Sequence, residues 1–264
     1  MATIPPSMDQ LVGSGARQMH IGSEDRVRME RAHVLAWPAL STAVIDGWLW
    51  RCSGGGSQRA NSVSTIDYSG SDMAIAVREV EARYQTRGVP ARFHTYDETH
   101  PTALSGMLRA RGYREGEATV TMFKRTEGRG VVPDVEQRDN PSTDWLDVYL
   151  GEISEDRRGV NALILDRVPA PRAFFGCRRD GRLVATALCV VGFGCAVIEC
   201  VATRAVERRR GAALAVLTAL ESWAARQGAD LIGLQVVTVN TPAIGLYQRL
   251  GFISGATNRF WIAE

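Results

Sequence analysis

Three consecutive arginines followed by a glycine, Arg208 to Gly211, stand between a strand-like segment and an amphipathic segment. The preceding residues 196–202 are apolar and β-branched, which predicts a buried strand. Apolar residues then recur at helical spacing from Ala213 to Ala224, which predicts a helix with one buried face. The first turn of such a helix presents free backbone N–H groups and the positive end of the helix dipole, beside the guanidinium charges. The segment therefore predicts an anion site, and the expected ligand is a phosphate or pyrophosphate.

Bulk composition excludes several classes of partner. The chain has 264 residues, of which 45% are hydrophobic, enough for a buried core in one large domain or two modest ones. Its formal net charge is only +2, so no overall field favours nucleic acid or a membrane surface as partner. The first residues lack a signal-peptide pattern, and no apolar run reaches transmembrane length. Residues 1–22 are polar and aperiodic, and we expect a flexible N-terminal tail.

The cysteines and histidines predict no metal site. Five cysteines without a CxxC pair indicate reduced thiols and a cytoplasmic protein. Cys195 and Cys200 are close in sequence, but none of the four histidines lies beyond residue 100. Strand packing is therefore the favoured interpretation of these two cysteines.

Hydrophobic periodicity along the chain predicts alternating helices and strands. Strands are expected at 47–52, 59–65, 91–96, 119–124, 172–177, 183–191, 196–203 and 231–237, and helices at 23–37, 74–87, 102–111, 143–153, 156–166, from 213 onward and at 242–250. This alternation indicates an α/β (α+β) fold with at least one parallel strand pair.

Two glycine turns predict hairpins. Asp180-Gly181 is expected at the tip of a hairpin between the strands on either side of it. Gly54 to Gly56 has the composition of a phosphate loop, but a strand-like run follows where such a loop requires a helix. We therefore expect a tight hairpin that joins 47–52 to 59–65.

The sequence contains an internal similarity at one fixed offset. Gly106–Tyr113 resembles Gly245–Phe252, and 245 − 106 = 139; Ala74–Val77 resembles Ala213–Val216, and 213 − 74 = 139. We interpret this as a tandem duplication, with a degenerate domain at 23–126, a linker at 126–133, a boundary near 126–135 and a catalytic domain at 131–264. The segment 119–124 is expected to close the first copy.

The first copy lacks the residues that could do chemistry. At the same offset, Ser69–Asp72 stands opposite Arg208–Gly211, which places a carboxylate where an anion would bind. Glu199 falls opposite Ala60, and Tyr247 falls opposite Leu108. The first half is therefore expected to be structural or to shape the substrate site, with a separate ligand of its own as the alternative.

The second half resembles the GNAT superfamily, the GCN5-related N-acetyltransferases, over residues 131–264. The family pattern of Arg or Gln, two residues, Gly, one residue, Gly or Ala is present as Arg208-Arg-Arg-Gly-Ala-Ala213. A second family element, an Asn followed by Ala and Leu-Tyr before Gly-Phe, is present from Asn240 to Phe252. The resemblance implies two GNAT-like domains, each with a mixed, mostly antiparallel sheet flanked by helices, and a splayed parallel strand pair in the second.

The resemblance also implies acetyl-CoA as co-substrate. Its pyrophosphate would bind backbone N–H groups beside Arg208, its pantetheine would pair with the preceding strand, and Asn240 would contact the pantetheine from the other side. The residues expected at these contacts are Arg208, Arg209, Arg210, Gly211, Ala212 and Ala213 for the pyrophosphate, and Val201, Ala202 and Thr203 for the pantetheine.

Acetyl transfer to an amine requires a neutral amine, a stabilised oxyanion and a hydrogen-bonded thiol. Tyr247 is expected to bond the sulfur as it gains charge, and a backbone N–H of Cys200 or Val201 to bind the oxyanion. Glu199 is the candidate base because it is the only acid in its strand. Pairing of Glu199 with an arginine is the equally weighted alternative, and a water chain or Asp230 would then accept the proton.

The expected acceptor is a primary amine, more readily a small molecule than a protein. Acidic residues at Glu152, Glu155 and Asp156 are candidates for attracting it, although a solvated helix end explains them equally well. Trp48, Trp50 and Tyr96 are candidates for a wall from the first half, with core packing as the alternative.

Two other functions compete with acetyl transfer to an amine. A non-catalytic acyl-CoA-binding or sensor protein remains open because the base is uncertain. A nucleic-acid binder is disfavoured by the near-neutral charge. The protein is expected to be a monomer or homodimer.

Overall fold

The strands of both halves form one continuous sheet in the computed structural model, which describes residues 21–128, 130 and 132–264. The strands are β1 (Ser41–Ile45), β2 (Trp48–Cys52), β3 (Val63–Ser64), β4 (Arg92–Thr95), β5 (Arg114–Glu115), β6 (Thr119–Arg125), β7 (Val135–Arg138), β8 (Arg172–Arg179), β9 (Arg182–Gly192), β10 (Cys195–Thr203), β11 (Leu231–Val237) and β12 (Ile253–Ile262). The helices are α1 (Ser23–Ala36), α2 (Met73–Gln85), α3 (Leu104–Ala110), α4 (Thr143–Gly151), α5 (Glu155–Leu165), α6 (Ala212–Arg226) and α7 (Thr241–Arg249). Most of the expected tail (1–20) and residues 129 and 131 of the expected linker lie outside the described residues.

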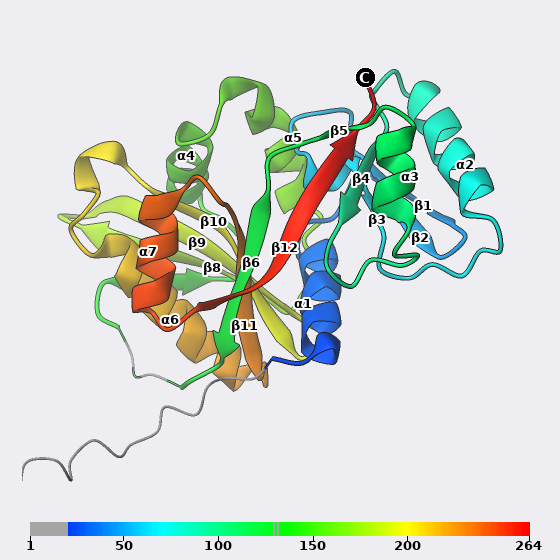
Figure 1. The fold of residues 1–264 in the computed structure, drawn as a ribbon. Helices are drawn as coiled ribbons and strands as arrows, with labels where there is room; N and C mark the ends of the chain where they lie inside the picture. The colour runs from blue at the N-terminus through cyan, green and yellow to red at the C-terminus, as the bar shows by residue number, and fades with distance from the viewer. Residues whose placement is uncertain (1–20, 129, 131) are drawn as a thin grey trace, which may run out of the picture.

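The two halves exchange strands at the centre of this sheet. Its order is β1-β2-β3-β4-β12-β6-β11-β10-β9-β8-β7, with β5 beside β12. Strand β6 belongs to the first half of the chain but pairs antiparallel with β11 along its whole length. Strand β12 pairs antiparallel with β6 up to Asn258 and with β4 from Arg259 onward, so it runs from one half into the other (Figure 1).

This pairing differs from the sequence expectation of a separate sheet in each half, the first closed by 119–124. Strand β6 instead extends the sheet of the second half, where Met122 packs on one face and Phe123 on the other. The local pattern of β6 predicts a strand but carries no information about its partners, because antiparallel pairing is decided by contacts far away in the sequence. The boundaries 23–126 and 131–264 stay predictions.

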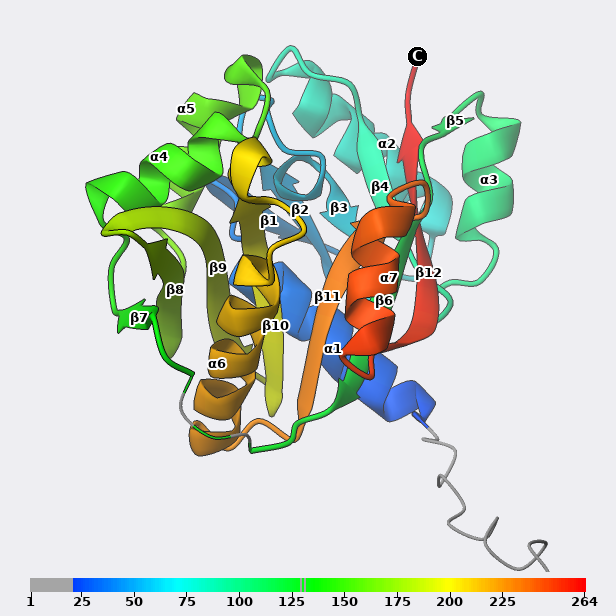
Figure 2. The ribbon, with the colours of Figure 1, turned by 90° about the vertical axis from the view of Figure 1, so that its left-hand side faces the viewer.

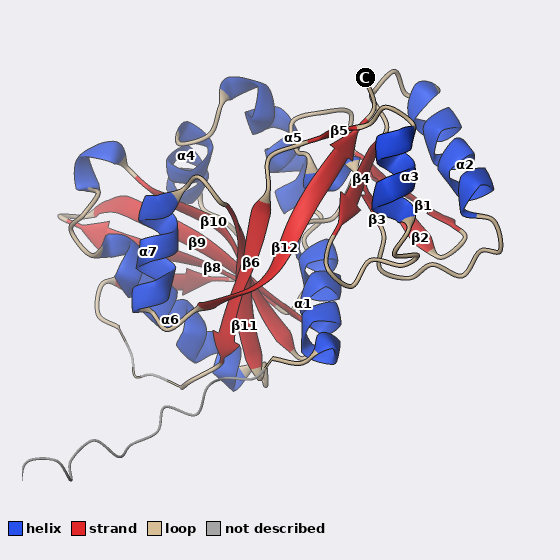
Figure 3. Ribbon diagram, viewed as in Figure 1, coloured by secondary structure: helices blue, strands red, loops and turns tan. Residues whose placement is uncertain are grey.

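Helices cover both faces of the sheet in the second half (Figure 3). Helices α6 and α7 lie in front of β10 and β11, and α1 lies behind them (Figure 2). The front core contains Leu220 of α6, and the rear core contains Met29 of α1 and Trp145 of α4. Helix α1 therefore packs against the second half of the chain, although it is the first helix in the sequence.

For the hairpin predicted around the three glycines, the antiparallel pairing is confirmed, since β2 pairs with β3 at Leu49–Ser64, but the tight turn is wrong. The tight turn lies one strand earlier, where Asp46-Gly47 joins β1 to β2 with φ values of 47° and 86°. Positive φ at both turn residues is the requirement of a type I′ hairpin, which Asp-Gly meets at little cost. The predicted hairpin at Asp180-Gly181 is confirmed, with φ values of 47° and 74°.

The three glycines belong to a wider loop, residues 53–61, that reaches the second half. It ends in a 3₁₀ turn, Arg59–Asn61, where the sequence predicts strand. The Asn61 side chain closes the loop by accepting from the Ser53 N–H at 2.7 Å and donating to the Ser57 carbonyl at 2.7 Å. A Cβ atom at Gly56 would lie 2.0 Å from Cγ1 of Val160 in α5. Glycine at this position therefore allows the loop to dock closely on α5.

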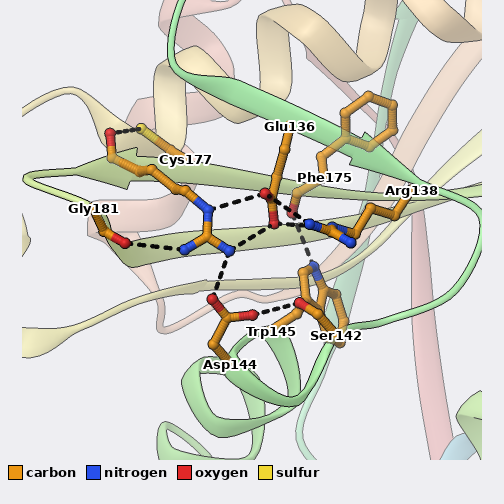
Figure 4. Close-up of polar contacts among 9 residues, drawn as sticks. Glu136, Arg138, Ser142, Asp144, Trp145, Phe175, Cys177 and Gly181 are labelled. Atoms are coloured by element: carbon orange, nitrogen blue, oxygen red, sulfur yellow. Dashed lines mark hydrogen bonds and ion pairs between the residues drawn. The ribbon is translucent and has the colours of Figure 1, made fainter.

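Helix α4 is held against the sheet by a polar cluster around Arg178 of β8 (Figure 4). The Arg178 guanidinium donates to Glu136 of β7 at 2.9 Å and to Asp144, in the first turn of α4, at 2.6 Å. The Trp145 indole N–H donates to the carbonyl of Phe175 at 2.9 Å. These contacts fix the start of the helix whose last turn carries Tyr149.

Because β6 and β12 belong to both halves, we expect the protein to unfold in one cooperative transition. Hydrogen exchange in urea should show that amides of β1–β4 and of β8–β10 lose protection at the same denaturant concentration. Near-ultraviolet circular dichroism and tryptophan fluorescence should give the same midpoint. Two separated transitions would contradict the interlocked sheet.

Candidate functional site

The parallel strands β10 and β11 separate where the sequence predicts the site. Their register contains only three pairs, from Cys195–Leu231 to Val197–Gly233. Beyond Val197, β10 continues for six residues without a partner on this side. The splayed parallel pair is thus present, and it leaves one edge of β10 available for a ligand.

A β-bulge interrupts β10 on its other side at the same level. Glu199 pairs with Leu188 and Ala202 pairs with Thr186, so Cys200 and Val201 have no partner in the β9 register. Cys200 has a φ of 54°, and its carbonyl accepts from the Thr186 hydroxyl at 3.2 Å. A bulge re-aims the backbone, so the N–H groups of Cys200 and Val201 become candidate donors to an oxyanion.

The N-terminus of α6 is an open donor site. Its N-cap is Gly211, whose φ is 85° and which has no side chain to bond the first helical N–H groups. Arg209 also has a positive φ, 63°, so the backbone curls before the helix begins at Ala212. Uncapped N–H groups at a helix start bind anions, with the dipole adding to the attraction.

The arginine side chains contribute less free charge than the sequence suggests. Arg208 bonds the Thr203 carbonyl at 3.2 Å and pairs with Glu152, and Arg210 pairs with Glu207 at 2.8 Å. Within the described part of the chain, Arg209 has no ion pair and is exposed. The anion site therefore rests on backbone donors and the helix dipole, with Arg209 as the unpaired cation.

Helix α7 brings two of the predicted residues to the opposite side of the strand opening. Asn240 is the N-cap of α7, and its side-chain oxygen accepts from the Ala243 N–H at 3.3 Å. Tyr247 is buried, with its ring 6.0 Å from that of Phe252. Burial, with a smaller effect of the Glu199 carboxylate, raises the pKa of Tyr247 to about 12. The phenol therefore keeps its proton at neutral pH and can donate a hydrogen bond.

Glu199 is bound to an arginine of the first half, the alternative left open by the sequence. Its two oxygens accept from the Arg59 guanidinium at 2.5 and 2.6 Å, and His33 of α1 lies 3.9 Å away. The side chain of Glu199 is 7% exposed; its burial opposes ionisation, but the Arg59 charge and hydrogen bonds outweigh it and lower the pKa to about 2. Such a carboxylate is a weak base.

The other base candidate from the sequence, Asp230, is also occupied by arginines. It pairs with Arg28 at 3.1 Å and with Arg125 at 2.8 Å, and these partners lower its pKa. It lies at the start of β11, away from the bulge.

A cavity of about 540 Å³ lies between the two halves. The loop 53–61 and β4 line it from the first half, and α4, α5, β6, β11 and β12 complete it. Arg59 connects this cavity to β10, because it both lines the wall and binds Glu199 beside the bulge. The lining residues are Trp37, Gly55, Gly56, Ser57, Gln58, Arg59, Asn61, Arg92, Glu117, Thr119, Tyr149, Asp156, Arg157, Gln235, Val237 and Phe260.

The acceptor residues expected from the sequence are only partly in this cavity. Asp156 lines it, whereas Glu152 faces the arginine turn and pairs with Arg208. Trp48, Trp50 and Tyr96 are buried away from its wall: the tryptophans pack in the first-half core, and Tyr96 bonds Ser64. The first half supplies Arg59 and Arg92 instead. No local pattern marks these two arginines, because each becomes a wall residue only when the halves meet.

A buried polar network holds the inner wall. Gln235 donates to Glu30 of α1 at 2.9 Å, and the Thr121 hydroxyl donates to the same carboxyl group at 2.6 Å. Burial is the largest effect on Glu30 and raises its pKa. Helix α1 thus positions Gln235 of the site, and His33 of the same helix lies 3.9 Å from Glu199.

The described residues provide no evident metal centre. No group of three or more His, Cys, Asp or Glu side chains in the described part of the chain has the arrangement to hold a metal ion. Among the described helices, none combines the length and apolar character that a bilayer crossing requires.

The sequence was compared with known protein families and proteins. The model of a family described as "Probable histone acetyltransferase Rv0428c C-terminal" matches residues 23–261. The chain is 28% identical over 239 residues to "Uncharacterized N-acetyltransferase YobR" of Bacillus subtilis (strain 168), covering 87% of this chain and 95% of that relative.

Solved structures share the fold at low identity. A GCN5-related N-acetyltransferase from Kribbella flavida has a TM-score of 0.69 and 16% identity, covering 90% of this chain and 95% of its own. A tandem GNAT protein from the clavulanic acid biosynthesis pathway has a TM-score of 0.59 and 12% identity, covering 77% of this chain and 75% of its own. These similarities show that the fold is the GNAT fold.

We expect Glu199→Gln and Arg59→Gln each to lower the free energy of unfolding by about 3 kcal/mol, because each leaves one buried charge without its partner. The double variant should lose less than the two single losses combined. Urea denaturation near pH 7 measures all four proteins. Since the pKa of Glu199 is about 2 in the fold and about 4.3 in an unfolded chain, the stabilisation is complete above about pH 4.3 and is lost as pH falls through 2. Simple additivity of the single losses would refute the coupling.

Proposed function

This chain belongs to the Rv0428c C-terminal family and is an acetyltransferase of the GNAT type, and on that premise we propose that it acetylates a primary amine from acetyl-CoA in a ternary complex. The observation that carries the proposal is the meeting of two sites at β10. The open end of α6 and the free edge of β10 suit a CoA thioester, and the cavity between the halves reaches the same strand through Arg59.

The residues present fit acetyl-CoA, which supplies the activated acetyl group. Backbone N–H groups of Arg209, Arg210, Gly211, Ala212 and Ala213 would hold the pyrophosphate, with Arg208 at the rim. The free edge of β10, from Val201 through Ala202 to Thr203, would hydrogen-bond the pantetheine amides. Asn240 uses its oxygen to cap α7, and its amide nitrogen would donate to the pantetheine.

Two groups of the chain act on the charge that moves during transfer. A C–N bond forms to the acetyl carbon as the C–S bond breaks, while the amine loses a proton and the sulfur gains one. The N–H of Cys200 or Val201 would bind the carbonyl oxygen as it becomes negative. Tyr247 would hydrogen-bond the sulfur as it gains charge, and because a pKa of about 12 keeps the phenol proton on Tyr247, the thiolate would take its proton from solvent.

Glu199 is assigned an indirect role. An alkylammonium group has a pKa of about 10.4, so proton transfer to a carboxylate of pKa about 2 is strongly uphill. A water chain from the cavity to bulk solvent, the route left open by the sequence, would carry the amine proton away. Glu199 would instead hold Arg59 in the cavity wall, and the cation-π contact of Arg59 with Trp37, at 5.6 Å, supports this fixed position.

We also propose that the two halves are tandem GNAT units, the first degenerate. Helix α2 begins at Met73 and α6 at Ala212, and 212 − 73 = 139 is the offset of the sequence repeat. The N-cap of α6 is Gly211, and the N-cap of α2 is Asp72, whose carboxylate accepts from the Ala74 N–H at 2.8 Å and from the Ile75 N–H at 3.2 Å. In the first half the donors of an anion site are thus occupied by the chain itself.

The cavity supports a small-molecule acceptor over a protein. A volume of about 540 Å³ is in the range of small-molecule sites. Three arginines line it, which disfavours a lysine-rich protein segment as acceptor, although the family description reads probable histone acetyltransferase.

Replacing Tyr247 with Phe should lower kcat by at least about tenfold and leave the Kd of acetyl-CoA nearly unchanged, because the phenol acts on the departing sulfur. Steady-state kinetics measure the first quantity and calorimetry the second. Tyr68→Phe is a matched control, since Tyr68 is a half-buried tyrosine of the first half. Equal losses of kcat and affinity would oppose the assigned role, and acetyl-CoA binding without turnover of any amine would favour the acyl-CoA-binding alternative.

Introducing the cap of α2 into α6 tests the pyrophosphate site. Gly211→Asp and Gly211→Asn both place a short polar side chain at a position with no atom near the added Cβ, and both residue types adopt positive φ readily. Only Asp adds negative charge. Its Kd for acetyl-CoA should be at least about tenfold higher than that of the Asn variant, measured by calorimetry. Equal affinities of the two variants would mean that the pyrophosphate binds elsewhere.

A further inference from the structure

Arg92 is a cation of the acceptor cavity without an acidic partner. It lies in β4 of the first half and lines the cavity wall. Its Nη1 donates to the Asn61 carbonyl at 3.1 Å, whereas its buried Nε has no hydrogen-bond partner. In the described part of the chain, no carboxylate forms an ion pair with it. Desolvation lowers the pKa of Arg92, as expected for a cation that lacks a nearby anion.

The other arginines of the cavity differ from Arg92. Arg59 is neutralised by Glu199, and Arg157 is exposed and donates to the Gly56 carbonyl at 3.0 Å. An arginine held half-buried without a counter-ion is unfavourable in the free protein, since the desolvation of its charge is not offset. A ligand oxyanion with access to the cavity would supply the missing charge.

The acidic residues of the cavity lie at its rim. Glu117 and Asp156 both line the cavity, both are exposed, and neither has an ion pair within the described residues. They are placed to attract an ammonium group from solvent, while Arg92 lies on the first-half side of the cavity. An amine that also carries an anion would thus meet charges of both signs, with its anion on β4 and its nitrogen free to approach the bulge of β10.

We propose that the acceptor is a small primary amine that also carries an oxyanion, a carboxylate or a phosphate, and that Arg92 binds this oxyanion. The proposal rests on the amine acetyltransferase function proposed above. It assigns Arg92 a specificity role, in which the first half selects the acceptor and the second half performs the transfer.

Matched acceptors test the charge requirement by kinetics. The pairs are 4-aminobutyrate with butylamine, 6-aminohexanoate with hexylamine, and phosphoethanolamine with ethanolamine, each alongside a lysine-rich peptide. In the wild type, kcat/KM for the oxyanion-bearing member of at least one pair should exceed that of the partner without the oxyanion by at least about tenfold. The carboxylate and phosphate pairs show which oxyanion is preferred. Self-acetylation adds little background, because the only lysine, Lys124, is buried against Glu221.

Arg92 variants assign the preference to this side chain. For each pair, the ratio compared is kcat/KM of the amine with the oxyanion over kcat/KM of the amine without it. In Arg92→Gln this ratio should fall toward one through a higher KM for the amine with the oxyanion, and Arg92→Lys should restore part of the ratio. Arg226→Gln, which removes an exposed arginine at the end of α6, should keep the wild-type ratio. A ratio near one in the wild type, an unchanged ratio in Arg92→Gln, or a preference for the lysine-rich peptide would overturn the proposal.

A binding measurement separates this proposal from the catalytic one. N-acetyl-6-aminohexanoate and N-acetylhexylamine are titrated by calorimetry into the protein saturated with CoA. The wild type should bind the anionic compound at least about tenfold more tightly, and Arg92→Gln should abolish the difference. This result with no amine turnover would refute the acetyltransferase function alone. Turnover with no anionic preference in binding or kinetics would refute the role of Arg92 alone.

Discussion

The antiparallel contact between β6 and β12 is the constraint on which the molecule depends. Each strand comes from one half of the chain and lies beside the last parallel strand of the other: β6 beside β11, and β12 beside β4. Trp261 of β12 consequently fills the first-half core, and Met122 of β6 fills the front core of the second half. The relative position of the halves is therefore set by backbone hydrogen bonds between their strands, and the cavity lies between halves that share one sheet.

The two helix N-termini at the repeat offset show how one fold can keep or lose an anion site. Asp72 bonds the first N–H groups of α2, whereas Gly211 leaves those of α6 open. Relative to glycine at the same position, a capping side chain stabilises a helix by only a few tenths of a kcal/mol, and α6 forgoes that contribution. Its stability comes instead from the apolar face that packs Val216, Leu217 and Leu220 on the sheet. The N-terminus of α6 thus provides the anion-binding groups, and its apolar face provides its stability.

Local pattern was sufficient for most of the secondary structure. Helices α1, α6 and α7 and strands β10 and β11 lie within one or two residues of their predicted starts. The helical spacing of apolar residues in α6 and the cap residue Asn240 of α7 mark two of these starts. The errors have local causes too. Strands β1, β5, β7 and β12 were not predicted, and the three glycines were expected to form a tight turn, although Asp46-Gly47 is the pair that meets the positive-φ requirement of a hairpin. The pairing of β6 with β11 and of β12 with β4 was not predictable, since the sequence of a strand does not determine which strand pairs with it.

The features of the site likewise separate into those that local sequence predicts and those that depend on tertiary contacts. The sequence by itself determined the positions of the arginine turn, of Asn240 and of Tyr247, because each depends on residues close together along one strand or helix. Only the tertiary structure decided that Glu199 pairs with Arg59, 140 residues away, that Arg208 is neutralised by Glu152, and that Arg92 lines the cavity. The charge on a buried side chain depends on the groups that share its low-dielectric surroundings. The pairing of distant strands brings those groups together, and the local spacing of residues in the sequence does not predict which groups will be neighbours.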